Sequence, residues 1–240
     1  MPLATATHAR TNAGLTAAAE KRLLIWIATR LPPWITSDGL SSIGLISMAA
    51  AGLSFAALRW TPWAAAAIVA SLVANWFGDS LDGTVARVRR QERPRFGYYV
   101  DHVIDLAGTT LLITGVACSG LMQPAIAWIV LAAYLLVSAE SYLATHAAGV
   151  FRMSFLGFGP TELRIVLAAG ALKGATSPWI DPFGGAPVRL FDVGGVVATI
   201  GLVAAFVAAA VRNTSALHRA EPLDRARGDD PAAAAQARVA

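Results

Sequence analysis

Long apolar stretches separated by short polar links make up most of the chain. Each apolar stretch has about 18 residues or more, enough for an α-helix to cross a hydrocarbon core of about 30 Å. The alternating pattern of a membrane β-barrel is missing from them, and helices satisfy their own backbone hydrogen bonds in lipid. The pattern therefore predicts an all-α integral membrane protein with six transmembrane helices, at 39–58, 63–88, 97–119, 123–149, 159–176 and 190–212.

The N-terminal region has a different pattern. Residues 15–31 alternate apolar turns with charged side chains, which is typical of an amphipathic helix lying on the membrane surface. Pro32 and Pro33 end this segment. We expect a cytoplasmic N-terminal segment with the interfacial helix, a six-helix domain and a loosely ordered cytoplasmic tail, at 1–38, 39–212 and 213–240.

Composition supports the membrane interpretation, and the distribution of charge predicts the orientation of the protein in the membrane. The chain is 56% hydrophobic and 14% charged, whereas about a quarter of a soluble domain is charged. Of the 19 Lys and Arg residues, only Arg59, Lys173 and Arg189 fall on the side opposite the N-terminus. The positive-inside rule then places both termini at the cytoplasmic face of the inner membrane. The basic pI of about 9.7 is explained by these loops, so no nucleic-acid partner is expected.

Four carboxylates interrupt the apolar pattern within "FGDSLDGTVARVRRQERPRFGYYVDHVIDLAG". Asp79 and Asp82 are three residues apart on one helix, and Asp101 and Asp105 are four apart on the next, so each pair shares a helix face. The short basic link lets the helices run antiparallel, so the two faces can meet. Oxygen-only ligands favour Mg²⁺ or Mn²⁺ over Zn²⁺. Four carboxylates can hold two such ions about 3.5–4 Å apart, which suits pyrophosphate chemistry.

A structural alternative is that these aspartates cap helices and pair with nearby arginines. The available partners are Arg87, Arg89, Arg90, Arg93 and Arg95. An ion-pair network does not require helical facing of both acidic pairs, so the spacing favours the metal site. Gly83 and Gly97 permit close approach of another group to the backbone, and together with Arg87 they indicate a nucleotide pocket.

The segment "DSLDGTVAR", followed after nine residues by "GYYVDHVID", resembles the signature D-x2-D-G-x2-A-R-x(8–9)-G-x3-D-x3-D of class I CDP-alcohol phosphotransferases (CDP-alcohol phosphatidyltransferases). The helical layout is similar to that family as well. The resemblance implies cleavage of a CDP-linked alcohol, transfer of its phospho-alcohol group to a hydroxyl acceptor, and release of CMP in phospholipid biosynthesis. It also implies a homodimer.

The resemblance further implies roles for the signature residues. Asp79, Asp82 and Asp101 would bind two divalent ions, Mg²⁺ or Mn²⁺. Asp105 would contact a metal and also act as general base on the acceptor hydroxyl. The cytidine and pyrophosphate site would be lined by Gly83, Ala86, Arg87 and Gly97.

A second group of polar residues lies where the fourth span ends and the fifth begins. Ionisable groups within membrane spans are functional candidates by default. The candidate acceptor residues are Glu140, Arg152, Thr161, Glu162 and Arg164. Structural pairing of Glu140 with His146, or of Glu162 with Arg164, is the alternative, with Thr161 as a helix cap. "FGPTELRI" loosely resembles a segment of choline and ethanolamine phosphotransferases, while a phosphorylated acceptor would need cations such as Arg152 and Arg164.

Two questions and two other activities stay open at this point. The lipid is either the donor, as CDP-diacylglycerol, or the acceptor for a CDP-linked polar head group. An intramembrane prenyltransferase also uses Asp-rich helices with Mg²⁺, but it lacks the D-G-x2-A-R run and generally has more spans. A cation transporter would need acidic groups near the midplane of several helices, and only Glu140 lies deeper in the sequence pattern.

Overall fold

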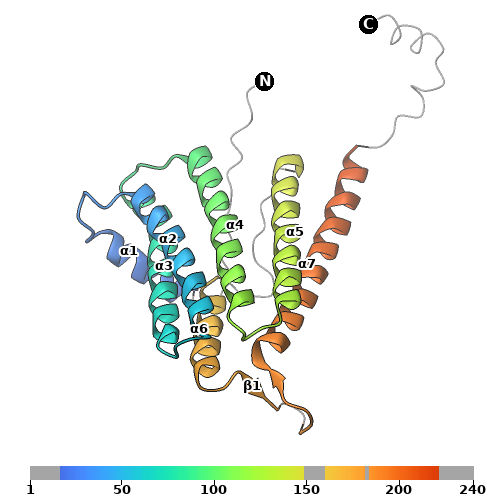
Figure 1. Cartoon of the computed structure of the whole chain (residues 1–240). Helices are drawn as coiled ribbons and strands as arrows, with labels where there is room; N and C mark the ends of the chain where they lie inside the picture. The colour runs from blue at the N-terminus through green and yellow to red at the C-terminus, as the bar shows by residue number, and fades with distance from the viewer. Residues whose placement is uncertain (1–16, 149–159, 182–183, 222–240) are drawn as a thin grey trace, which may run out of the picture.

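The computed structural model describes residues 17–148, 160–181 and 184–221 (Figure 1). This part of the chain is helical apart from one short hairpin. The elements in chain order are α1 (Ala17–Ala28), α2 (Ser37–Ala57), α3 (Ala64–Val88), α4 (Pro94–Cys118), α5 (Pro124–Ala148), α6 (Pro160–Thr176), β1 (Trp179–Ile180), β2 (Val188–Arg189) and α7 (Leu190–Ala220).

Five helices, α2, α3, α4, α5 and α7, are long and apolar enough to cross a membrane. This finding confirms a helical, multi-pass membrane protein. Helix α6 is not among these candidate spans within the described residues. Its 17 residues extend about 25 Å at 1.5 Å per residue, less than the thickness of a typical hydrocarbon core. The sixth span therefore stays a prediction.

The expected helix boundaries agree with the structure to within three residues, except at the end of α7. Helix α4 begins at Pro94, three residues earlier than expected, because proline is well suited to the first turn of a helix. Helix α7 continues to Ala220, so the end predicted at 212 is too early. Residues 213–221 contain no glycine or proline that would end the helix before Pro222. The β1–β2 hairpin was not predicted, since strands of two residues are too short to show alternation.

Helix α2 joins the two helices that carry the aspartates, because it packs against both α3 and α4. Both crossings depend on glycine. A Cβ atom on Gly78 would lie 2.6 Å from the backbone nitrogen of Gly44, and one on Gly115 would lie 2.0 Å from the carbonyl oxygen of Gly52. Small residues let membrane helices approach this closely. Helix α2 thus connects the two helices that carry the acidic faces, α3 and α4.

Helix α1 packs on the side of α3. Leu24 and Ala28 are buried in a small cluster with Leu40, Leu81 and Val85. The outer side of α1 also carries large apolar residues, with Leu23, Ile25 and Trp26 exposed. This contact holds α1 against the part of α3 that contains the first two aspartates.

The bundle has two distinct ends (Figure 1). The α3–α4 link and the C-terminal end of α7 lie at one end. The α2–α3 turn, the α4–α5 turn and the β1–β2 hairpin lie at the other end. The antiparallel course of α3 and α4 therefore brings all four aspartates toward the same end of the bundle.

Candidate active site

Helix α2 supplies the hydroxyl groups around the second aspartate. The Ser41 hydroxyl donates a hydrogen bond to Asp82 Oδ2 at 2.6 Å, and the Ser37 hydroxyl donates to the Asp82 backbone carbonyl at 3.0 Å. Thr36 caps α2, because its side chain accepts a hydrogen bond from the Gly39 backbone amide at 3.1 Å. The contact of Ser41 with the motif was not predicted, because it joins residues that are far apart in the chain.

The first aspartate is bound to α6. Arg164 forms an ion pair with Asp79, and its Nε donates to Asn75 Oδ1 at 2.8 Å. Asn75 in turn donates to the Gly44 carbonyl at 3.0 Å, so one chain of polar contacts runs through α6, α3 and α2. Asn75 is buried and lies one helical turn before Asp79. A polar residue at that position inside an apolar run was the available signal for this network.

Three of the arginines near the link have partners outside the motif aspartates. Arg87 donates to the Thr84 hydroxyl at 3.2 Å. Arg89 donates to backbone carbonyls before α2, including that of Ile35 at 2.6 Å. Arg93 pairs with Asp38. These three arginines thus have partners other than the motif aspartates, whereas Arg164 pairs with Asp79.

The four carboxylates share one region of the bundle. The charges of Asp79 and Asp101 act on Asp82, and the charges of Asp79 and Asp105 both act on Tyr134 of α5. Within the described residues, no group of three or more His, Cys, Asp or Glu side chains is gathered closely enough to hold a metal ion. Like charges repel one another, and two of the aspartates point to other partners, Arg164 and Ser41. The donor set nevertheless fits Mg²⁺ or Mn²⁺, since it consists of carboxylate oxygens.

The residues expected around the nucleotide lie at the surface of the same end. Arg87 and Gly97 are exposed, and Ala86 is partly exposed. A Cβ atom on Gly83 would lie 3.3 Å from an Arg87 guanidinium nitrogen, so this arginine lies along the glycine. The space around Gly97 is open to 4 Å. This surface is accessible to a soluble ligand.

The candidate acceptor residues divide into separate places. The Thr161 hydroxyl donates to Glu20 Oε1 at 2.9 Å, and the same oxygen accepts from the Trp76 indole at 2.7 Å, which joins α6, α1 and α3. Glu140 accepts from the Asn213 side-chain amide at 2.6 Å and belongs to the contact of α5 with α7.

Two further candidate acceptor residues are Glu162 and Arg152. Glu162 is partly exposed in the first turn of α6, beside Thr161. Arg152 lies outside the described residues. The structure therefore brings Thr161 and Arg164 to the α3 side of the bundle, and it leaves Glu140 on the α5–α7 side. Glu20, which anchors Thr161, was missed because it was counted among the charges of a surface helix.

Comparison with known proteins supports the resemblance in the sequence. The family model described as CDP-alcohol phosphatidyltransferase matches residues 31–212, a range that contains all four motif aspartates, the candidate spans α2 to α5 and most of α7. A search of curated proteins finds no match. The matched range covers well over half of the 240 residues. The chain therefore belongs to the CDP-alcohol phosphatidyltransferase family, whose members are membrane transferases of phosphate-containing groups in phospholipid synthesis.

Proposed function

We propose that this protein transfers a phospho-alcohol group from a CDP-alcohol to an acceptor hydroxyl and releases CMP, in a reaction that depends on a divalent metal. The observation that carries the proposal is the complete eight-residue signature at one end of a bundle that the family model covers. A site at the end of the spans lies where a water-soluble nucleotide can meet a lipid. The family assignment argues against the prenyltransferase and cation-transporter alternatives.

Asp79, Asp82, Asp101 and Asp105 are the residues that would hold Mg²⁺ or Mn²⁺. Such ions neutralise pyrophosphate charge and make CMP a better leaving group. Because Asp79 also pairs with Arg164, this arginine would keep the carboxylate oriented toward α6. Ser41 fixes one oxygen of Asp82 and leaves the other directed along α3 toward the Gly83 amide.

Asp105 is the proposed general base. It is partly buried on α4, and its charge acts on Tyr134 and Tyr142 of α5, so it faces the interior of the bundle. In the proposed step, Asp105 takes the proton of the acceptor hydroxyl, whose oxygen attacks the phosphorus that carries the alcohol. The bond from that phosphorus to the bridging oxygen breaks, and CMP leaves with this oxygen. Gly83, Ala86, Arg87 and Gly97 would hold the CDP moiety.

The acceptor pocket is proposed for the α3–α6 side of the bundle. Thr161, Glu162 and Arg164 lie together at the start of α6, and Arg164 contacts the motif through Asp79. The same arrangement accommodates CDP-diacylglycerol with a polar acceptor, or a CDP-linked head group with a lipid acceptor. Arg152 and Glu140 are kept as weaker members of this proposal.

The finer description of the membrane arrangement also belongs to the proposal. We place α6 as a sixth span and α1 at the membrane interface, where exposed Trp26 and Leu23 would enter the lipid. Both termini and the site would lie at the cytoplasmic face of the inner membrane. The domain at 39–212 would lie between two cytoplasmic segments. A homodimer is proposed from the family resemblance.

The experiment that tests the reaction measures CMP release by the detergent-purified protein with Mg²⁺, Mn²⁺ or EDTA. The donors are CDP-diacylglycerol, CDP-choline, CDP-ethanolamine and CDP-inositol, each with a panel of acceptors. Asp105→Asn is the test variant, and Asp38→Asn is the matched control, because Asp38 is an exposed carboxylate at the same end. Metal-dependent release that is lost only in Asp105→Asn supports the proposal. Failure of the folded protein to bind any CDP-alcohol in the presence of metal refutes it.

A further inference from the structure

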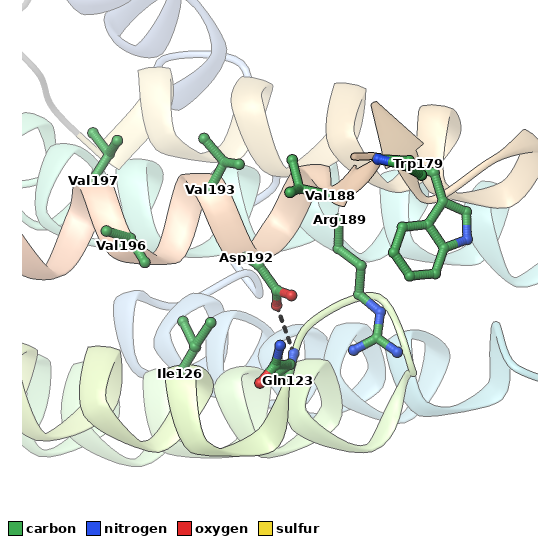
Figure 2. Close-up of a pocket in the computed structure, with 10 residues that line it drawn as sticks. Gln123, Ile126, Trp179, Val188, Arg189, Asp192, Val193, Val196 and Val197 are labelled. Atoms are coloured by element: carbon green, nitrogen blue, oxygen red, sulfur yellow. Dashed lines mark hydrogen bonds between the residues drawn. The ribbon is translucent and has the colours of Figure 1, made fainter. Parts of the chain in front are cut away.

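A cavity of about 520 Å³ lies at the end of the bundle opposite the motif aspartates (Figure 2). It is formed by the start of α5, the β1–β2 hairpin and the first turns of α7. This volume is within the range of about 300–1,000 Å³ that is common for ligand sites. The cavity does not include any residue of the CDP-alcohol signature.

One side of the cavity is polar and carries a cation. The Arg189 guanidinium lies 5.3 Å from the centre of the Trp179 ring. Among the described residues, no carboxylate comes within ion-pair distance of Arg189. Asp192 is near, but its carboxylate accepts a hydrogen bond from the backbone N–H of Gln123 at 2.7 Å. This bond holds the carboxylate at the start of α5 (Figure 2). The positive charge of Arg189 is therefore available to an anion.

The other side of the cavity is apolar and lies on α7, a candidate membrane span. Val193, Val196 and Val197 of α7 are 36%, 48% and 65% exposed, and Ile126 of α5 lies across from them (Figure 2). Helix α7 is a candidate span, so these exposed valines face hydrocarbon. Trp179 stands at the polar side, and tryptophan is enriched at the head-group level of membranes. The lining thus changes from polar groups that suit a lipid head group to apolar groups that suit an acyl chain.

We propose that this cavity binds one membrane phospholipid with an anionic head group. Its phosphate would accept paired hydrogen bonds from Arg189, since guanidinium geometry matches phosphate oxygens. One acyl chain would lie along Val193, Val196 and Val197. The ligand is a bound structural lipid, because the cavity and the proposed catalytic residues are at opposite ends of the bundle. This inference does not depend on the proposed transferase reaction.

The test is native mass spectrometry of the full chain in detergent, titrated with phosphatidylglycerol or phosphatidylcholine. Arg189→Gln is compared with Arg59→Gln, because Arg59 also lies over a tryptophan ring, that of Trp60 at 4.9 Å, at the same end but outside the cavity. We expect one tightly bound phosphatidylglycerol on the unmodified protein and on Arg59→Gln. Arg189→Gln should bind it about tenfold more weakly, the loss typical of a hydrogen bond to a charged group.

A second pair of variants tests the apolar side and covers the case in which Arg189→Gln does not fold. Val196→Trp fills the space facing Ile126, and Val207→Trp is its control on α7, with a similar exposure of 50% against 48%. Only Val196→Trp should lose the lipid. Equal binding by all variants overturns the proposal, as does equal binding of phosphatidylcholine. Displacement of the lipid by glycerol phosphate alone would also overturn it, because it would identify a soluble anion as the ligand.

Discussion

The crossing of α2 and α3 beside Asp79 allows a quantitative prediction. In Gly78→Ala the new Cβ atom would lie 2.6 Å from both the Gly44 nitrogen and the Leu40 carbonyl oxygen. Ordinary contact begins at 3.4 Å, so the two helices must separate by about 0.8 Å. Both neighbouring atoms belong to the backbone of a helix, and no side-chain rotation can relieve the contact.

The expected cost follows from this overpacking. Forcing an extra group into a well-packed interior costs about 1–3 kcal/mol. The higher helix propensity of alanine offsets about 1 kcal/mol of this. We therefore expect Gly78→Ala to lower the free energy of unfolding by up to about 2 kcal/mol, and to lower the midpoint of thermal unfolding by up to about 8 °C. A shift near 1 Å at the site should also reduce CMP release, by about tenfold to a hundredfold.

The assay is thermal unfolding in detergent by intrinsic tryptophan fluorescence, followed by CMP release with the best donor and acceptor. Gly201→Ala is the matched control, because it lies in α7 and has no atom within 4 Å of the added Cβ. The control should be unchanged or slightly more stable. If Gly78→Ala is as stable and as active as Gly201→Ala, the close crossing of α2 on α3 does not position the aspartates, and the reasoning fails.

Three further substitutions test the site. Asp105→Asn should lower CMP release by about a hundredfold or more, with an unchanged midpoint of unfolding, because the proposed base is lost; parallel loss of folding would contradict this role. Arg164→Gln leaves the Asp79 charge without its ion pair and should lower the free energy of unfolding by about 3 kcal/mol, measured by thermal unfolding. Added Mn²⁺ should restore part of this stability. Ser41→Ala removes one hydrogen bond to Asp82 and should weaken the binding of Mn²⁺ by about 1–2 kcal/mol. The measurement is the Mn²⁺ concentration needed for half-maximal CMP release, which should rise. An unchanged Mn²⁺ requirement would exclude Ser41 from the metal site.

The sequence alone determined five of the spans and the signature, because both are local properties. An apolar run long enough to cross lipid forms a helix whatever its neighbours are, and the spacings of Asp79 to Asp82 and of Asp101 to Asp105 fix their shared faces through helical geometry. The extension of α7 and the early start of α4 were missed only at the level of helix ends, where local signals are weakest.

The tertiary structure decided which helices touch and which polar groups meet. In a membrane protein both the buried and the lipid-facing sides of a helix are apolar, so the hydrophobic pattern does not reveal that α2 joins α3 to α4. The ion pair of Arg164 with Asp79 and the hydrogen bond from Thr161 to Glu20 join residues far apart in the chain. Such contacts depend on close helix crossings at glycine, whose geometry is set by backbone-to-backbone distances that no sequence spacing encodes.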